Sequence, residues 1–451
     1  MKTRKRLILT IVLLSYFITA IDGSIVITGV AKIAADLHLS PSLLSWVQNA
    51  YVLAWGGFML LGGRMSDTFG RKRILNLSLV LFGIGSLLAG ISWSASVMIA
   101  ARFIQGVGSA ILAPTSLALI MDYFEGAERV KAVAWYSSIS GLGLCFGLVF
   151  GGAITNFLSW RDGFLVNIPF IIFMLFVSAG VLQRGETKKE PFDIWGTLLS
   201  VIGIFTFVYA INGARDVWLW SCVALSALAA FVRVEAKTAA PIMPLRLFRS
   251  ATRWRAYAAR ALFVGAMMGF NFTISEYMQE VCGFTPLLAG VGFLPMTVFT
   301  FLAAIEVPRL VGKHGNRYVL AVGLACLFIG FVWLFLLDAG SPYLTGIALP
   351  MVVLGIGNGL TLSPLTNLGI ENVEAKDSGA ASGLVNAAHQ IGGAIGLSTM
   401  VAAGTDVSGM EERCRIGMIV AAAFIMMAII LSFRGTWFRR CKESRFLRCM
   451  K

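Results

Sequence analysis

The sequence predicts an all-α integral membrane protein, and its composition and its apolar runs support this fold class. Of 451 residues, 57% are hydrophobic and only 13% are charged, whereas a soluble domain usually has about 25% charged residues because it needs a polar surface. The apolar residues form continuous runs, without the alternation typical of barrel strands. The composition therefore excludes an ordinary soluble enzyme, and it equally excludes a disordered chain.

The chain contains fourteen apolar runs long enough to cross a hydrocarbon core of about 30 Å as helices. They lie at 7–30, 43–62, 74–93, 97–120, 132–155, 163–183, 195–212, 217–233, 258–280, 287–308, 318–337, 342–364, 380–404 and 416–434. The weakest are 217–233 and 258–280, where Arg260 and Glu276 intrude, so a count of twelve stays open. The first run resembles a signal peptide, but it continues to Val30, which favours an uncleaved helix.

Lysine and arginine are distributed unequally between the segments that connect these runs. With fourteen spans both termini share one side, which holds 31 of the 37 basic residues, against 5 on the opposite side and Arg102 within a span. Because basic loops stay in the cytoplasm, both termini are predicted to be cytoplasmic. The net charge of +14 follows from this topology, so no nucleic-acid partner is expected.

Two loops resemble each other and indicate a duplicated chain, as many transporters have. Residues 62–75 read GGRMSDTFGRKRIL and residues 307–320 read VPRLVGKHGNRYVL. At a constant offset the matched pairs are Arg64 with Arg309, Gly70 with Gly315, Lys72 with Arg317 and Leu75 with Leu320. We expect an N-terminal six-helix bundle at 1–184, a central two-helix insert with cytoplasmic linkers at 185–257, and a C-terminal six-helix bundle with a basic tail at 258–451.

Two ionisable residues are predicted to lie at the same depth in the bilayer, where charges are costly and usually functional. Asp22 lies about 22 Å along the first span from the inner surface, and Arg102 lies about 8 Å from the outer surface. We expect both to face a shared polar cavity, where a change in their distance or in water access would load or release a proton. A permanent structural pair is the alternative.

Two further ionisable residues are candidates for proton or substrate coupling. Glu276, near the outer end of its span, would attract a proton or a cationic substrate, or would simply face external water. His389 has a near-neutral reference pKa and two amide neighbours, although a helix-packing histidine is the alternative. The polar candidates for the cavity wall are Gln105, Asn271, Asn386 and Gln390.

Glycine spacing gives two more predictions. The fifth span carries a strip of glycines that permits close helix approach, either as static packing or as a sliding contact; its members are Gly143, Gly147, Gly151 and Gly152. The loop after the second span combines glycines with an acid among basic residues, and we expect it to act as a conformational latch. The latch residues are Gly63, Asp67, Gly70, Arg71 and Lys72.

These motifs resemble those of the major facilitator superfamily, specifically its fourteen-span drug/proton antiporters of the multidrug and quaternary ammonium type. The loop is similar to the motif G-x-L-x-D-x-x-G-R-K, and RFIQGVGSA at 102–110 to R-x-x-Q-G-x-G. WRDGFLVNIP at 160–169 is similar to W-R-x-x-F-x-x-N-x-P. Residues 277–295 and 378–396 resemble further signatures of the family.

The resemblance implies a major-facilitator-type fold of two six-helix bundles plus two inserted helices. It also implies alternating access driven by the proton gradient, with Asp22 handling protons or cations and Arg102 linked to coupling. The sequence departs from the family where Leu148 replaces a motif proline, where the stretch after Asp22 lacks the usual asparagine and Leu-Pro, and where His389 replaces a common arginine.

The sequence therefore predicts proton-coupled efflux of lipophilic, cationic drugs or other toxic small molecules across the inner membrane of a bacterial cell. The alternative is a narrow-specificity exporter, or an importer, of a single metabolite or antibiotic. No nucleophile motif, P-loop or metal-ligand spacing occurs, so we expect no enzyme activity, no cofactor and no metal. The expected partners are a small-molecule substrate, protons and the lipid bilayer, and the protein is expected to be a monomer.

Overall fold

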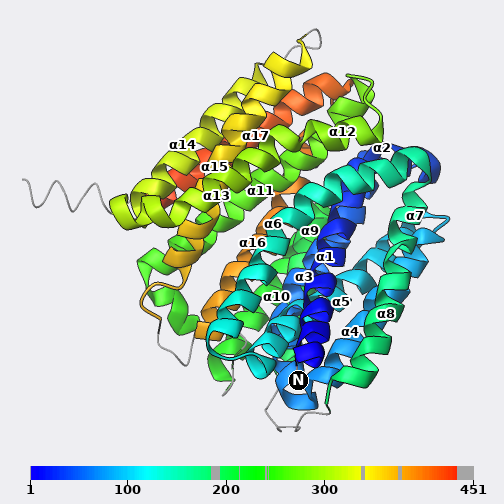
Figure 1. Ribbon diagram of the computed structural model, residues 1–451. Coiled ribbons are helices and arrows are strands. Elements are labelled where there is room, and N and C mark those ends of the chain that lie inside the picture. Colours follow the sequence, from blue (N-terminus) through cyan, green and yellow to red (C-terminus); the bar gives the residue numbers. More distant parts are fainter. Residues whose placement is uncertain are drawn as a thin grey trace, which may run out of the picture.

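A computed structural model places the chain as a set of long helices packed side by side (Figure 1). The structure describes the chain except residues 1, 184–192, 213, 239–240, 242, 337–340, 374–377 and 434–451. It gives the backbone alone at residues 2, 60, 67, 127, 130, 134, 137–145, 378 and 379. Within the described ranges every regular element is a helix, which agrees with the all-α prediction.

The helices form three consecutive groups along the sequence. Those before the first long gap are α1 (Lys2–Thr28), α2 (Val30–Leu37), α3 (Pro41–Phe69), α4 (Arg71–Gly90), α5 (Ala95–Tyr123), α6 (Gly126–Phe157), α7 (Trp160–Leu165) and α8 (Asn167–Val181). The inserted pair is α9 (Ile194–Ile211) and α10 (Val217–Lys237), followed by the short η1 (Leu245–Arg249). The remainder are α11 (Ala251–Glu280), α12 (Pro286–Gly292), α13 (Leu294–His314), α14 (Asn316–Phe335), η2 (Leu344–Ala348), α15 (Leu349–Gly369), α16 (Ser378–Ala403) and α17 (Met410–Phe433).

Eleven candidate membrane spans occur among the described helices, by length and composition. Some join two elements, as at Trp160–Val181, Pro286–His314 and Leu344–Gly369. The three predicted spans without a counterpart in this set fall on α3, α6 and α16, which are long helices with positions outside the description. The count of fourteen and the cytoplasmic location of both termini stay predictions.

Local sequence explains where several helices begin. Ser40 caps α3 by accepting a hydrogen bond from the Leu43 amide at 3.3 Å, and Pro41 occupies the first turn, where its missing N–H costs nothing. Ser159 and Asp162 form a reciprocal capping box at the start of α7. These caps satisfy amides that have no partner within their own helix.

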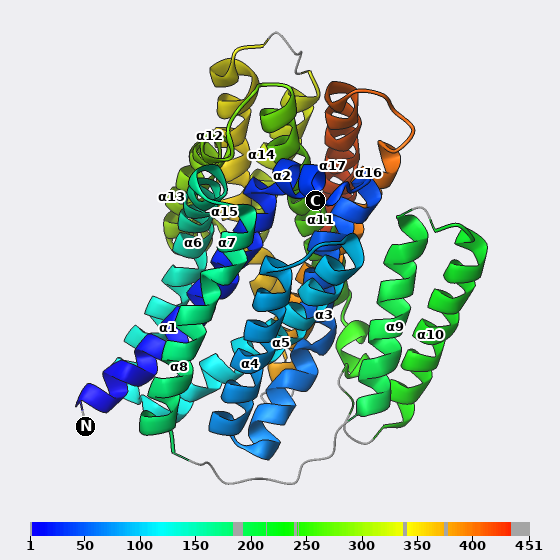
Figure 2. The same cartoon turned by 90° about the vertical axis from the view of Figure 1, so that its right-hand side faces the viewer.

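The early helices and the late helices form separate bundles, with the inserted pair beside them (Figures 1 and 2). In the first bundle α3 and α4 pack on α5, and α1 packs on α6; in the second α11 packs on α16 and α17, and α15 on α13 and α14. Figure 2 shows α9 and α10 as a hairpin near α3. The predicted boundary at 184 lies outside the described residues and the one at 257 falls within α11, so the division at these positions stays a prediction.

The two loops that the sequence pairs have the same backbone conformation. Gly70 joins α3 to α4 with φ of 89°, and Gly315 joins α13 to α14 with φ of 81°. Only glycine adopts such positive φ values freely, because it has no Cβ. The two loops therefore match in backbone conformation as well as in sequence, which supports duplication of the bundles.

Contacts between the bundles gather at the end of the molecule away from Lys2. Ser275 of α11 donates to the Ile27 carbonyl of α1 at 2.7 Å, and Asn49 of α3 donates to Ser398 of α16 at 2.8 Å. The apolar core of the second bundle also includes Ile27 and Leu148 of the first. The bundles therefore close on each other at this end.

Candidate functional site

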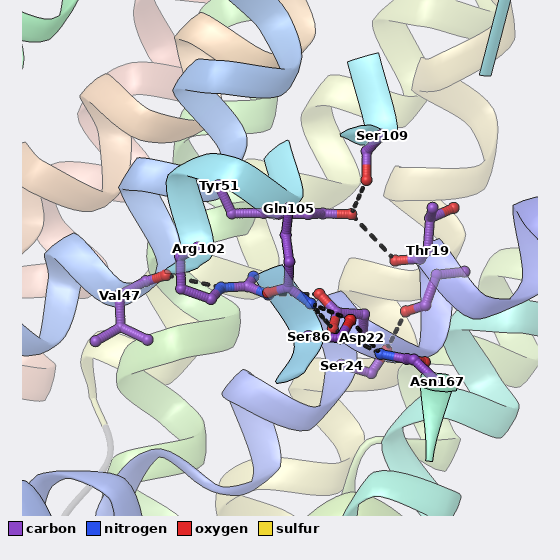
Figure 3. A network of polar contacts seen from close by, with 11 residues as sticks. Thr19, Asp22, Ser24, Val47, Tyr51, Ser86, Arg102, Gln105, Ser109 and Asn167 are labelled. Atoms are coloured by element: carbon purple, nitrogen blue, oxygen red, sulfur yellow. Dashed lines mark hydrogen bonds and ion pairs between the residues drawn. The ribbon is translucent and has the colours of Figure 1, made fainter. Parts of the chain in front are cut away.

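Asp22 and Arg102 form a buried ion pair inside the first bundle (Figure 3). Asp22 comes from α1, whereas Arg102 comes from α5, and its Nη1 donates to Oδ2 of the carboxylate. The other carboxylate oxygen accepts from Gln105 Nε2 at 2.8 Å and from Asn167 Nδ2 at 3.1 Å. Three donors from two further helices thus satisfy an ionised carboxylate in an apolar bundle.

Arg102 has partners besides the carboxylate. Its Nε donates to the Val47 carbonyl at 3.1 Å, and its Nη1 donates to Gln105 Oε1 at 2.9 Å. The guanidinium carbon lies 4.1 Å from the centre of the Tyr51 ring and 5.6 Å from that of Phe164, within the range of cation–π attraction. These contacts hold the guanidinium in place independently of Asp22.

The predicted proximity of Asp22 and Arg102 is confirmed, but neither side chain has any exposed surface. In this conformation they lie in a closed polar network and do not line an open cavity. Gln105 is also fully buried within this network, rather than in a cavity wall. Removing one member of such a pair leaves an uncompensated buried charge, at a cost of about 3–5 kcal/mol.

Several members of this network were not among the predicted site residues. Asn167 stands in the matched W-R-x-x-F-x-x-N-x-P motif, so the sequence carried a signal for it. Ser86 accepts from Gln105 at 2.8 Å, and Tyr51 shares a 3.0 Å hydrogen bond with Ser109. A serine and a tyrosine in apolar runs give no comparable signal, because either is common in ordinary helix packing.

The glycine strip of α6 faces two different helices. A Cβ at Gly147 would lie 2.5 Å from Ser24 Oγ, and one at Gly151 would lie 3.1 Å from the Ile25 Cα, so both pack α6 against α1. A Cβ at Gly152 would lie 2.5 Å from the Pro286 carbonyl of α12, in the other bundle. The surroundings of Gly143 lie outside the described residues. The strip therefore serves both packing within a bundle and contact between bundles.

Leu148, which replaces the motif proline, lies at the same contact between bundles. Its side chain is 3% exposed, and its carbonyl would be 2.3 Å from a Cβ on Gly290 of α12. The close approach of α6 and α12 at this point thus depends on glycine from both helices. The contact between α6 and α12 therefore forms although leucine stands at position 148 in place of the motif proline.

The predicted latch residues bind partners within the first bundle. Arg71 forms an ion pair with Asp122 at the end of α5, and Lys72 donates to the carbonyls of Ala179 and Leu182 at 2.9 and 2.8 Å. These two carbonyls lie at the C-terminal end of α8, where a cation is favoured. The loop thus has the acidic and helix-terminal partners that a latch requires.

The remaining latch residues are described in part. Gly63 packs on α5, where a Cβ would lie 3.7 Å from Pro114 Cβ, and Gly70 provides the positive φ that joins α3 to α4. The side chain of Asp67 lies outside the described residues. Release of this loop in another conformation stays a prediction.

Glu276 and His389 lie apart from the Asp22 network and from each other. Glu276 is half-buried near the end of α11, where Glu280 and Arg413 are the charged groups that act on it. His389 of α16 contacts Arg260 of α11, with 3.3 Å between Nδ1 and Nη2. Arg260 was noted in the sequence only as a charge interrupting a span, although an isolated intramembrane arginine is itself a signal.

The other polar candidates lie along the second bundle. The Oδ1 of Asn271 is buried without a hydrogen-bond partner. Asn386 and Gln390 are half-buried on α16, and Gln390 Cβ would lie 2.7 Å from a Cβ on Gly56 of α3. Gln390 therefore sits at the contact between the bundles, next to His389.

The fold and this site define a multi-span helical membrane transporter built from two bundles. The chain belongs to the Major Facilitator Superfamily, whose sequence profile matches residues 12–397. This membership confirms the family that the motifs indicated.

Sequence relatives are bacterial. The chain is 35% identical to the uncharacterized MFS-type transporter EfpA of Mycobacterium tuberculosis over 395 residues, 85% of this chain and 74% of that protein. It is 35% identical to the cephamycin export protein CmcT of Amycolatopsis lactamdurans, covering 92% and 89% of the two chains. It is 31% identical to a puromycin resistance protein of Streptomyces alboniger, covering 95% and 90%.

Solved structures share the fold. A bacterial homologue of the lysosomal transporter Spinster, in an inward-facing and occupied conformation, aligns with a TM-score of 0.73 and 15% identity over 95% of this chain and 96% of that one. A peptide transporter POT in complex with alafosfalin aligns with a TM-score of 0.70 and 14% identity, over 94% and 93%.

Proposed function

We propose that the protein exports lipophilic drugs or other toxic small molecules across the bacterial inner membrane in exchange for protons, by alternating access. The direction and the substrate class are supported by relatives named for cephamycin export and for puromycin, lincomycin and multidrug resistance. The single observation that supports proton coupling is the fully buried Asp22, held by Arg102.

The transport cycle follows from where the bundles touch. Gly152 and Pro286 join α6 to α12 at the end away from Lys2, and Ser275 bonds to Ile27 at the same end. Opening this end requires these close contacts to separate while the opposite end closes, which is a rocking of two rigid bundles. With cytoplasmic termini, the end near Lys2 faces the cytoplasm, and we propose that substrate enters between the bundles from this end.

The coupling step follows from the partners of Arg102. Protonation of Asp22 removes the negative charge from the pair, while Val47, Gln105 and Tyr51 keep the guanidinium in place. A neutral acid costs less to bury alone than a carboxylate does. The pair then separates more readily, so the two protonation states of Asp22 favour different packing of α1 on α5.

Breadth of substrate is part of the proposal. Relatives at 30% identity or more carry the names of chemically different antibiotics, so an exporter of lipophilic compounds is favoured over a single-metabolite exporter or an importer. A cationic substrate, a monomeric state and the absence of enzyme activity remain predictions. Glu276 is the half-buried acid on α11 that would attract a cation.

Everted membrane vesicles test this proposal with ethidium as a lipophilic cation. We expect respiration to drive ethidium into vesicles that contain the protein, and a protonophore to abolish that uptake. Vesicles with an Asp22→Asn variant provide the matched control. Uptake that continues unchanged with the protonophore would contradict proton coupling, and the absence of uptake in all vesicles would contradict ethidium export.

A further inference from the structure

A second buried cation lies in the other bundle, and among the described residues no acid lies beside it. Arg260 of α11 is 6% exposed, and its Nη1 donates to the Leu362 carbonyl at 3.0 Å and to Thr366 Oγ1 at 2.6 Å, both on α15. Its Nη2 contacts His389 Nδ1 of α16. A buried guanidinium thus has three neutral partners, in contrast to Arg102, which has a carboxylate.

Acidic residues on the surrounding helices are distant or exposed. Neither α15 nor the described part of α16 contains an acid, and the nearest acid on α11 is Glu276. Sixteen residues of helix separate Glu276 from Arg260, a distance of about 24 Å. Glu371, just beyond α15, has an exposed side chain. The charge of Arg260 is therefore not neutralised by a described acid within its own pocket.

The polar atoms that remain at this pair are all hydrogen-bond donors. Because a guanidinium can only donate, His389 Nδ1 is the acceptor of their contact, and the imidazole proton lies on Nε2. The Nε of Arg260 is buried without a partner, and Nη2 keeps one further N–H. The open Nε and Nη2 groups form one planar edge of the guanidinium, which matches the two oxygens of a carboxylate.

The pair lies at the edge of a close helix contact. A Cβ on Gly392 would lie 2.3 Å from the Ala261 Cα, and one on Gly396 would lie 2.2 Å from the Gly265 Cα, so α11 and α16 touch from Ala261 onwards. Arg260 and His389 come just before this contact, toward the first residues of α11 and α16. Gln390, the next residue on α16, meets α3 of the other bundle.

We propose that Arg260 and His389 form an anion-binding subsite that takes the carboxylate of an amphipathic organic acid during export. This inference rests on the proposed function. It adds amphipathic organic acids, as a second substrate class, to the cationic substrates expected from Glu276. A buried cation without a counter-ion is costly, and an incoming carboxylate removes that cost while its apolar body stays among the helices. The guanidinium is already oriented by Leu362 and Thr366, so it loses little conformational freedom on binding.

Binding to the purified full-length protein in a neutral detergent tests this subsite. The probes are pyrenebutyrate and its methyl ester, which share one fluorescent apolar body and differ in the carboxylate, and fluorescence anisotropy gives each Kd. We expect wild type to bind the acid at least about tenfold more tightly than the ester, a typical effect of one charge-assisted bidentate contact. Arg260→Gln should abolish this preference and leave ester binding unchanged.

Three further variants keep the result interpretable. Arg260→Lys keeps the charge but loses the planar edge, so we expect a several-fold loss of acid affinity alone; His389→Gln should weaken acid binding while the ester is unaffected. Arg255→Gln is the control, because Arg255 lies on the same helix but contacts the Trp254 ring. Should Arg260→Gln fail to fold, Arg260→Lys and His389→Gln carry the test.

Equal Kd values for acid and ester in wild type, or unchanged acid binding in Arg260→Lys and His389→Gln, would overturn the subsite. Ethidium uptake in everted vesicles separates this failure from failure of the proposed function. We expect Arg255→Gln to retain protonophore-sensitive ethidium uptake, since Arg255 contacts the Trp254 ring and is not part of the subsite. Loss of ethidium uptake in wild type would contradict the export proposal while leaving the binding preference measurable.

Discussion

Asp22 and Arg102 lie 80 residues apart in the sequence and form an ion pair in which neither side chain has any exposed surface. Both residues belong to the first bundle, Asp22 on α1 and Arg102 on α5. We propose that a proton reaches Asp22 when the packing of α1 against α5 changes, and that the pair thereby links protonation to the movement of the bundles.

The Asp22→Asn variant is expected to fold and to lose uphill efflux. Asparagine keeps the shape of the acid and an oxygen that accepts from Arg102, but it cannot exchange a proton. Ethidium efflux from intact cells, together with the amount of folded protein in the membrane, checks this prediction. Wild-type efflux by the variant would exclude Asp22 from coupling.

A second carboxylate provides the matched control for that variant. Asp36 also pairs with an arginine, Arg161, at 3.0 Å, but its side chain is half exposed and lies outside the spans. Because exposed pairs contribute about 0–1 kcal/mol, Asp36→Asn should leave ethidium efflux unchanged. Similar losses in both variants would point to general damage.

Stability and transport are expected to separate when both partners of the buried pair are replaced. Arg102→Met alone leaves Asp22 uncompensated and should destabilise the protein by about 3–5 kcal/mol. Combining it with Asp22→Leu replaces the pair by apolar groups, which should restore most of that stability without restoring transport. Thermal unfolding in detergent and ethidium efflux measure the two effects; efflux by the double variant would refute a coupling role.

The Gly152→Ala variant is expected to reduce efflux through the contact between bundles. The new Cβ would lie 2.5 Å from the Pro286 carbonyl, and a backbone atom cannot move aside as a flexible side chain does. Gly180→Ala in α8 is the control, because a Cβ there has no heavy atom within 4 Å. Initial efflux rates compare the two, and equal rates would show that close approach of α6 and α12 is dispensable.

Gly70→Ala is expected to destabilise the loop between α3 and α4. At φ of 89° and ψ of 134° a Cβ is strained, at a cost of about 1–3 kcal/mol. Gly312→Ala, in α13 with open space around it, should cost little. Thermal unfolding of the two variants is the measurement, and a Gly70→Ala protein as stable as wild type would contradict the strain argument.

The pH dependence of the Asp36 contact has a definite sign. The hydrogen bond from the Trp160 indole, and after it the Arg161 guanidinium, lower the pKa of Asp36 below its ordinary value. Its contribution to stability is therefore present above the unfolded pKa of about 3.9 and is lost as the pH falls through the lower folded pKa. The difference in unfolding temperature between wild type and Asp36→Asn should be small near neutral pH and vanish in strong acid; a difference that grows with acid would contradict this sign.

Depth along a helix was enough to predict that Asp22 and Arg102 lie at the same level of the bilayer, because each span has a fixed rise per residue. Spacing also predicted that the glycines of α6 allow close approach. Sequence periodicity could not show that Gly151 faces α1 whereas Gly152 faces α12, since this depends on how α6 is wedged between the bundles.

Other features of the site depend on rotation of helices about their axes. Asn167 completes the carboxylate network only because α8 turns it toward Asp22, and Arg260 meets His389 only through the packing of α11 on α16. Long apolar runs leave this rotation undetermined, because lipid-facing and bundle-facing positions are both apolar. For the same reason the sequence could not show that Asp22 is fully buried in this conformation.

Proton release on substrate binding tests the central role of Asp22 most directly. Ethidium is added to purified protein in a weakly buffered, neutral detergent solution, and a pH-sensitive dye records the protons released. We predict that wild type releases protons and that Asp22→Asn, binding ethidium with similar affinity, releases none. Equal proton release by the two proteins would contradict the account, because it would place the exchanged proton on another group.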